Sequence, residues 1–282
     1  MMDDVRGLLA RYGLAPSKGL GQNLLISPAV YTRIVEAAEL SPSDVVLEIG
    51  PGLGTLTRRL AARAGVVAAI ELDRKMVAVL EQELAGVDNV HIIAGDALEL
   101  DPAETLRRVG ADLSGGYKVV ANLPYYITSR ALRHLLAESD RPRLLVLMVQ
   151  REVADRLRAG PGEHSLLSLS VQAFGSVEQV CRVPASAFYP APKVASAVVR
   201  IAVDERPAID SALQPAYFRV LRAGFGQKRK QLHNSLSANL ALPSGRAHQL
   251  LVQAGIPPTA RPQSLSLEQW RALARAFVDE AR

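Results

Sequence analysis

The strongest constraint on the fold is a glycine-rich segment, Glu48 to Thr55, with the sequence Glu-Ile-Gly-Pro-Gly-Leu-Gly-Thr. It lies where an apolar run typical of a buried strand, 45–49, gives way to a helical pattern, 55–64. Alternating glycines let the backbone turn tightly and let a ligand approach without clashes from β-carbons. The spacing differs from the dinucleotide fingerprint, and Pro51 removes one of the amides that a diphosphate would need. The segment therefore predicts a strand–loop–helix unit that binds a ligand without a diphosphate.

The first half of the chain alternates short β-branched apolar runs with helical patterns, which is typical of a parallel sheet with crossover helices. We predict strands over 45–49, 66–70, 90–94, 118–121 and 144–149. Helices are predicted over 55–64, 74–84 and 128–136. Two later runs, 177–183 and 197–203, are predicted to be strands that can close the sheet as an antiparallel hairpin.

The pattern changes after the segment Asp204-Glu205-Arg206-Pro207. Helical patterns separated by Pro and Gly follow, over 215–224, 230–240, 245–254 and 267–281. We therefore predict a domain boundary near residue 206, with an α/β domain over 1–206 and a small all-helical domain over 207–282.

Acidic residues follow two of the predicted strands. Glu71 comes roughly 20 residues after the glycine loop, where such folds bind ribose hydroxyls through a carboxylate that accepts both hydrogens. Asp96 follows the next strand and can accept a hydrogen bond from an adenine amino group. Either acid alone can be a helix cap, and a nicotinamide-dependent oxidoreductase would share the first. Both acids at successive strand ends favour an adenosine site.

A fourth strand end carries the segment Asn122-Leu123-Pro124-Tyr125-Tyr126. An adenine 6-amino group is a poor nucleophile because its lone pair is delocalised into the ring. The Asn122 side-chain carbonyl and the backbone carbonyl of Leu123 or Pro124 can both accept from that amine, which would aim its lone pair at an electrophilic methyl group. Tyr125 offers a face on which the base can stack. The alternative is a proline-containing turn with a packed tyrosine.

The net charge of +5 and the sequence pI near 9.5 agree with an anionic partner, and the charge distribution is more informative. Residues 211–267 contain no Asp or Glu. The basic residues of this tract predict a phosphate-backbone footprint, although a solvated basic face is the alternative. They are Arg219, Arg222, Lys228, Arg229, Lys230, Arg246 and Arg261.

Other features limit the cellular setting. No apolar run approaches the roughly 20 residues that span a bilayer, and the acidic N-terminus differs from a signal peptide. Cys181 is the single cysteine, and the five histidines are scattered, so we expect no disulfide and no metal site. We expect a cytoplasmic protein without a membrane partner.

Taken in order, these segments resemble the adenine dimethyltransferases of ribosomal RNA over nearly the whole chain. The family comprises small-subunit dimethylases and large-subunit enzymes that confer antibiotic resistance. The matching positions are 18–25, 48–55, Glu71, Asp96, 122–125, 188–194, 225–230 and 261–267. Leu24 stands where the family usually has Phe, and His233 where Arg is common.

The resemblance implies a class I S-adenosylmethionine-dependent methyltransferase fold, with a Rossmann-like seven-stranded sheet. It implies that S-adenosylmethionine is held by Asn23, Leu25, Gly50, Gly52, Glu71, Asp96 and Asn122. Catalysis would use Asn122, Leu123, Pro124 and Tyr125, with Phe188 closing over the flipped target base. RNA would be bound through Arg222, Lys228, Arg229 and Lys230.

The small-subunit branch fits best, because Gly21 precedes Gln22 and the tetrapeptide is Asn-Leu-Pro-Tyr. We therefore expect dimethylation of two adjacent adenosines near the 3′ end of small-subunit RNA, by a monomer that binds a small-subunit precursor. The nearest alternative is a large-subunit resistance methyltransferase. A ribosome-assembly or transcription factor without turnover, a nicotinamide-dependent oxidoreductase and a DNA adenine methyltransferase are the others.

Overall fold

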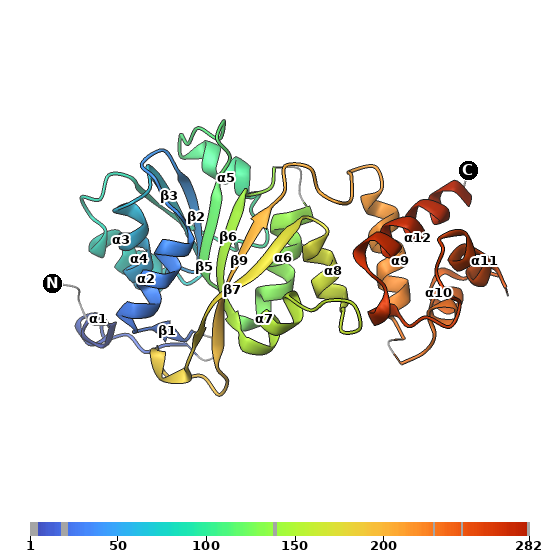
Figure 1. Cartoon of the computed structure of the whole chain (residues 1–282). Helices are drawn as coiled ribbons and strands as arrows, with labels where there is room; N and C mark the ends of the chain where they lie inside the picture. The colour runs from blue at the N-terminus through green and yellow to red at the C-terminus, as the bar shows by residue number, and fades with distance from the viewer. Residues whose placement is uncertain (1–4, 18–21, 138–139, 228, 244, 281–282) are drawn as a thin grey trace. The chain divides into compact units, whose positions relative to one another are not determined.

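The apolar runs of the first half form a seven-stranded sheet in the structure, a computed structural model that describes residues 5–17, 22–137, 140–227, 229–243 and 245–280 (Figure 1). The strand order is β4-β3-β2-β5-β6-β9-β7. The strands are β2 (Val45–Ile49), β3 (Val66–Glu71), β4 (Val90–Ala94), β5 (Lys118–Asn122), β6 (Leu144–Gln150), β7 (Gly175–Val183) and β9 (Ser196–Val203). The predicted α/β organisation is confirmed, and β3 and β5 each run one residue further than predicted, to Glu71 and Asn122.

The centre of the sheet is parallel, since β2 pairs in parallel with β3 and β5, β3 with β4, and β5 with β6. The late strand β9 pairs with β6 in antiparallel fashion. All five residues of β2 are buried, as expected for a parallel strand covered on both faces. One face packs Val46, Val120 and Val146 against two helices, α2 (Pro28–Ala37) and α3 (Thr55–Ala61).

Two helices of this part begin at a side-chain cap. Asp73 accepts the backbone N–H of Lys75 at the start of α4 (Arg74–Glu83), and Asp101 accepts that of Glu104 at the start of α5 (Pro102–Arg108). Helices α3, α4 and α6 (Thr128–Ala137) correspond to helices predicted from the sequence. Five further helices were not predicted, and nearly all of them are too short to show a periodic pattern: α1 (Val5–Arg11), α2, α5, α7 (Arg151–Leu157) and α8 (Leu166–Gln172).

A separate two-stranded ladder joins segments far apart in the sequence. β1 (Leu24–Leu25) pairs antiparallel with β8 (Phe188–Tyr189), which places Leu25 opposite Phe188. A 3-10 helix, η2 (Ala185–Ala187), leads into β8. This ladder anchors the N-terminal segment beside the glycine loop, because the β-carbon of an alanine at Gly52 would lie 3.1 Å from the Leu24 side chain.

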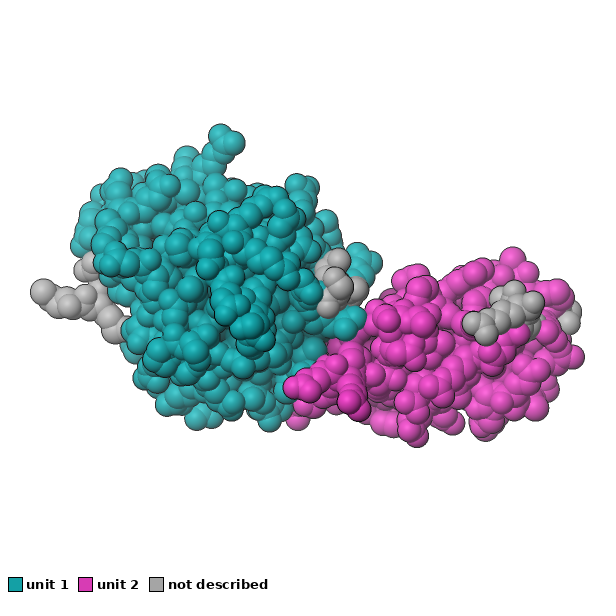
Figure 2. All heavy atoms as spheres, turned by 90° about the horizontal axis from the view of Figure 1, so that it is seen from above, with its two compact units in different colours: residues 1–154, 177–203 teal, residues 155–176, 204–282 magenta. Residues whose placement is uncertain are grey.

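The chain divides into two compact units, shown in different colours in Figure 2. The first comprises residues 1–154 and 177–203, and the second residues 155–176 and 204–282. The second unit therefore combines α8 with the C-terminal helices, which are α9 (Gln214–Phe225), α10 (Leu232–Leu240), α11 (Arg246–Gln253) and α12 (Leu267–Glu280). The boundary predicted near residue 206 rests on the change in sequence pattern and stays a prediction.

The helical unit has its own aromatic core. Trp270 and Tyr217 are fully buried, and the Trp270 ring stacks on Phe225 at 5.6 Å between centroids. Gly224 permits this packing, because a β-carbon there would lie 2.4 Å from the Trp270 ring. The Tyr217 hydroxyl donates to the Leu169 carbonyl at 3.0 Å, which ties α9 to α8. No helix within the described ranges of either unit is long and apolar enough to cross a membrane.

Candidate active site

A cavity opens at the edge of the sheet where the four parallel strands β4, β3, β2 and β5 end. Ligands of open α/β sheets bind at this edge. Most of the site residues predicted from the sequence line this cavity together: Asn23, Gly50, Gly52, Glu71, Asp96, Asn122, Leu123, Pro124 and Tyr125. Leu25 lines a smaller neighbouring cavity, which shares Gly50, Gly52 and Asn122 with the first.

The glycine loop needs glycine for its backbone conformation. Gly50 and Gly52 have φ angles of +70° and +59°, in the left-handed region that L-residues with side chains rarely adopt. The turn aims the Gly52 N–H at a side-chain oxygen of Glu71, 3.0 Å away. The loop is thereby held against the end of β3, and its bare backbone forms part of the cavity wall.

The Glu71 carboxylate is held by main-chain donors from both sides. Its Oε2 accepts from Gly52 and its Oε1 accepts the N–H of Asp73 at 2.9 Å. The side chain is buried, and burial raises the pKa of Glu71 above its usual value while the two backbone hydrogen bonds oppose the rise. Each oxygen has a second lone pair, so the group can still accept hydrogen bonds from a ligand in the cavity.

The structure shows that neither Glu71 nor Asp96 is a helix cap. Asp73, not Glu71, caps α4, and its second oxygen accepts from the Gln22 side chain at 3.1 Å. Asp96 accepts the N–H of Leu98 through Oδ1 at 2.9 Å, in a turn after β4. Glu71 and Asp96 therefore both present carboxylates to the cavity, and neither caps a helix.

Asn122 is the last residue of β5, and its amide is oriented by the N-terminal segment. The Nδ2 group donates to the main-chain carbonyl of Asn23 at 3.1 Å. A carbonyl oxygen can only accept, so this contact identifies the nitrogen and fixes the rotamer of the amide. The Oδ1 atom is then the acceptor that Asn122 can offer to a ligand.

The residues after Asn122 form a short 3-10 turn, η1 (Tyr125–Ile127). The Pro124 carbonyl accepts the N–H of Ile127 at 3.1 Å, while the Leu123 N–H donates to Met148 on β6 at 3.3 Å. The Tyr125 hydroxyl lies 2.7 Å from the hydroxyl of Ser196, the fully buried first residue of β9. Burial raises the pKa of Tyr125, so the phenol stays neutral. The contact with Ser196 holds the Tyr125 side chain at the cavity wall.

Phe188 lies apart from these residues. Its side chain is 3 % exposed, packs in the core with Val30 and Ile34, and is not among the residues that line either cavity. Its neighbour on β8, Tyr189, is exposed and lies under the guanidinium of Arg6 at 5.0 Å. The role predicted for Phe188 over a flipped base would require its ring to leave this core, and it stays a prediction.

Several cavity residues were missed by the sequence analysis. Leu72, between Glu71 and Asp73 after β3, is half exposed. Tyr126, the residue after the tetrapeptide, is also exposed. Arg130, on the first turn of α6, brings a positive charge to the wall. All three lie close in sequence to a predicted site residue: Leu72 follows Glu71 directly, and Tyr126 and Arg130 come one and five positions after Tyr125. Across the described ranges, no cluster of His, Cys, Asp and Glu could hold a metal ion.

The helical unit carries the positive charge of the protein. Residues 204–282 hold eleven Lys and Arg against six Asp and Glu, an excess equal to the net charge of the whole chain, +5. Arg222, Arg229 and Lys230, predicted to bind RNA, are exposed after or at the end of α9. Lys228, predicted with them, lies outside the described residues.

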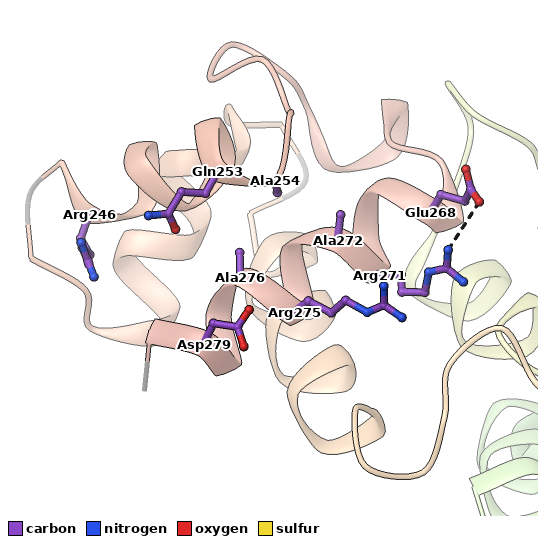
Figure 3. A pocket seen from close by; sticks show the side chains of 9 residues that line it. All are labelled: Arg246, Gln253, Ala254, Glu268, Arg271, Ala272, Arg275, Ala276 and Asp279. Carbon is purple, nitrogen blue, oxygen red and sulfur yellow. Dashed lines mark ion pairs between the residues drawn. The ribbon is translucent and has the colours of Figure 1, made fainter. Parts of the chain in front are cut away.

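A groove between α11 and α12 adds further basic side chains to this unit (Figure 3). Arg271 and Arg275 extend from α12, and Arg271 pairs with Glu268 at 3.6 Å between nitrogen and oxygen. Arg246 comes from the start of α11, and Ala272 and Ala276 lie along the floor. The groove mixes both charges and so favours no single ligand class.

The comparisons with known proteins decide the family. The family model described as ribosomal RNA adenine dimethylase matches residues 16–279. The chain belongs to this family. The match spans most of both compact units, and the adenine dimethylase resemblance stated from the motifs is confirmed.

Two curated relatives of this rRNA adenine dimethylase carry the name ribosomal RNA small subunit methyltransferase A. The protein of Pelotomaculum thermopropionicum is 46 % identical over 98 % of this chain and 96 % of its own length. That of Dehalococcoides mccartyi is 42 % identical over 99 % of this chain and 94 % of its own length.

Solved structures confirm the fold predicted for the rRNA adenine dimethylase family. A dimethyladenosine transferase from Plasmodium falciparum gives a TM-score of 0.77 at 28 % identity, over 92 % of this chain and 98 % of that one. The 23S rRNA methyltransferase ErmE gives 0.69 at 28 % identity, over 91 % of this chain and 100 % of that one. The chain therefore has the class I methyltransferase fold with C-terminal helices.

Proposed function

We propose that this family member is a small-subunit rRNA dimethyltransferase that uses S-adenosylmethionine to dimethylate the 6-amino groups of two adjacent adenosines. The observation that carries the proposal is the oriented amide of Asn122, fixed by Asn23 in a cavity that also contains Glu71 and Asp96. The identity of 42–46 % to small-subunit enzymes, against 28 % to a 23S enzyme, favours the small-subunit branch.

The residues present suit S-adenosylmethionine. Two carboxylates and an amide oxygen are acceptors, which match the hydroxyl and amino hydrogens of an adenosine and would repel a diphosphate. The bare backbone at Gly50 and Gly52 lets such a ligand lie against the loop. Asp96 would hold the adenine, Glu71 the ribose, and Asn23, Leu25 and Asn122 the amino-acid end. When bound, this cofactor supplies an electrophilic methyl group.

The tetrapeptide would orient the target base. Asn122 Oδ1 accepts one hydrogen of the 6-amino group, and a main-chain carbonyl accepts the other. Leu123 is better suited than Pro124 to supply that carbonyl, because the Pro124 carbonyl already accepts from Ile127. Tyr125, held by Ser196, supplies a stacking face. Once methylated, the amine nitrogen is positively charged and loses its proton readily, so methyl transfer needs no dedicated general base.

The basic residues of the helical unit would bind the phosphates of a small-subunit precursor in the cytoplasm. Arg222, Arg229 and Lys230 are the exposed described residues of this set. Phosphate contacts position an RNA without reading its sequence, so selection of the adenosines would fall to the tetrapeptide and to RNA shape.

The test is methyl transfer from labelled S-adenosylmethionine to small- and large-subunit particles that lack the modification, for the wild type and Asn122→Ala. We expect label in small-subunit RNA, recovered as dimethyladenosine and lost in the variant. Label in large-subunit RNA alone would move the protein to the resistance branch. Cofactor binding without transfer to either particle would favour an assembly factor.

A further inference from the structure

A second acid near the glycine loop has no role in the site described above. Glu48, the fourth residue of β2, is 1 % exposed, and its Oε2 is buried without a hydrogen-bond partner among the described residues. Glu71 and Asp96 differ, because each accepts main-chain N–H groups. A buried acceptor left unpaired is destabilising, so an unpaired oxygen on a buried acid requires an explanation such as a functional role or a bound ion.

Glu48 faces a small cavity on the inner side of the glycine loop. Asn122, Gly50, Gly52 and Leu24 line both this cavity and the larger one, so the two adjoin. Among the described residues that line the small cavity, Glu48 is the only acid and Tyr31 is the other titratable side chain. The Tyr31 hydroxyl is already engaged, donating to the Leu25 carbonyl at 2.7 Å. Any cation that entered the cavity would therefore find its counter-charge at Glu48.

The strand order gives the direction in which a ligand would extend. Along the edge β4-β3-β2-β5, Asp96 comes first, Glu71 second, and Glu48 with Asn122 last. If Asp96 and Glu71 hold adenine and ribose, as the proposed function has it, the remaining amino-acid end lies toward β2 and β5. That end of the cofactor carries an ammonium group.

We propose that Glu48 is the counter-ion of the ammonium group at the amino-acid end of the cofactor. The inference rests on the proposed function and adds a binding residue to it. It accounts for an acid under a loop whose other side chains are apolar or absent, and for an oxygen of that acid that has no hydrogen-bond partner among the described residues.

The protonation of Glu48 follows from its surroundings. Burial raises the pKa of Glu48 to about 8; the Thr57 side chain opposes this rise, and the neighbouring Glu71 carboxylate adds to it. Arg59 lies over the ring of Tyr31, with its guanidinium carbon 4.6 Å from the ring centre. At pH 6.5 Glu48 is therefore a neutral acid in the free protein. An ammonium group beside it would lower its pKa, so cofactor binding would release a proton.

The experiment is titration calorimetry at pH 6.5 in two buffers of different ionisation enthalpy. The ligands are S-adenosylhomocysteine, which keeps the ammonium group, and 5′-methylthioadenosine, which lacks the amino-acid end. For the wild type we expect release of close to one proton with the first ligand and none with the second. Because this measurement needs no variant, it tests the inference even where a substitution fails to fold.

Glu48→Gln keeps the shape of the neutral acid and cannot ionise. We expect it to abolish proton release and to weaken S-adenosylhomocysteine by roughly tenfold or more, with 5′-methylthioadenosine unaffected. Absent proton release in the wild type, or unchanged affinity in the variant, would overturn the assignment. Failure of the wild type to bind either ligand would instead overturn the proposed function.

Discussion

The side-chain amide of Asn122 donates to the main-chain carbonyl of Asn23 at 3.1 Å, joining residues 99 positions apart. The contact connects the end of β5 to the segment just before β1, so the N-terminal segment sets the rotamer of the proposed catalytic amide. Asn122→Asp removes the donor and puts a negative charge against that carbonyl. We expect methyl transfer to fall by ~100-fold or more, because an oriented acceptor is lost. Thermal unfolding checks that the fold survives, and near wild-type transfer would remove Asn122 from the mechanism.

Ser196 positions Tyr125 through the 2.7 Å contact between their hydroxyls. Tyr125→Phe and Ser196→Ala each delete that contact while keeping the ring. We expect each to lower kcat severalfold and the double variant to be no worse than either single one, since both remove the same interaction. The measurement is a double-mutant cycle on transfer rates. Additive losses would mean that the two residues act independently.

Glu71 and Glu48 are predicted to act on different ends of the same ligand. Glu71→Ala removes the acceptor at the end of β3, and it leaves the Gly52 and Asp73 N–H groups without their side-chain partner. We expect it to weaken S-adenosylhomocysteine and 5′-methylthioadenosine alike, by roughly 10–100-fold, as for the loss of hydrogen bonds to a charged group. Calorimetry on both ligands is the check. A loss confined to the ligand with an amino-acid end would contradict the ribose assignment.

Lys118 anchors the start of β5 by a buried ion pair. Its ammonium donates to Asp44 at 3.0 Å and to the carbonyls of Ala38 and Glu39 after α2. Lys118→Met would leave the buried Asp44 carboxylate without its ammonium partner. We expect the free energy of unfolding to fall by about 3–5 kcal/mol. The control is Arg107→Met, which breaks an exposed pair with Asp140 and should cost under about 1 kcal/mol. Equal effects in denaturant titrations would contradict the role of the buried pair.

The same pair predicts a pH dependence of stability. Burial alone would raise the pKa of Asp44, but the Ser41 N–H and Lys118 outweigh it and hold the pKa below its ordinary value. A depressed folded-state pKa stabilises the fold above the unfolded-state pKa, and that stabilisation is lost as the pH falls through the folded-state value. We expect the destabilisation caused by Asp44→Asn, measured by denaturant titration, to be largest near neutral pH and to shrink in acid. A constant difference across that range would show that Asp44 does not titrate differently on folding.

The central sheet and its functional edge could be predicted because the signals are local. Apolar runs define the strands, and parallel strands bring Glu71, Asp96 and Asn122 to one edge without any knowledge of packing. The burial of Phe188 was not predictable in this way, since it depends on the ladder between β1 and β8. The orphaned oxygen of Glu48 likewise depends on what surrounds the strand, which no spacing in the sequence reveals.

The grouping of α8 with the C-terminal helices was missed for a related reason. A seven-residue helix gives little periodic signal. The hydrogen bond that joins Tyr217 to Leu169 of this helix links residues 48 positions apart in the sequence. The acid-free tract, in contrast, was visible in the sequence, because charge composition needs no tertiary information.

The exposed cations after α9 predict that the affinity for RNA depends on salt concentration. Arg229→Glu with Lys230→Glu reverses two exposed charges and should weaken binding to small-subunit RNA at physiological salt. Each lost phosphate contact lowers the slope of log affinity against log salt, so the slope should fall by roughly 1.5–2. The matched control is Arg63→Glu with Arg108→Glu, the same charge change at exposed positions of the α/β unit, where we expect a much smaller effect. S-adenosylhomocysteine affinity should be equal in both double variants, because neither touches the cavity. Equal loss of RNA binding in the two would mean that net charge, and not a footprint after α9, attracts the RNA.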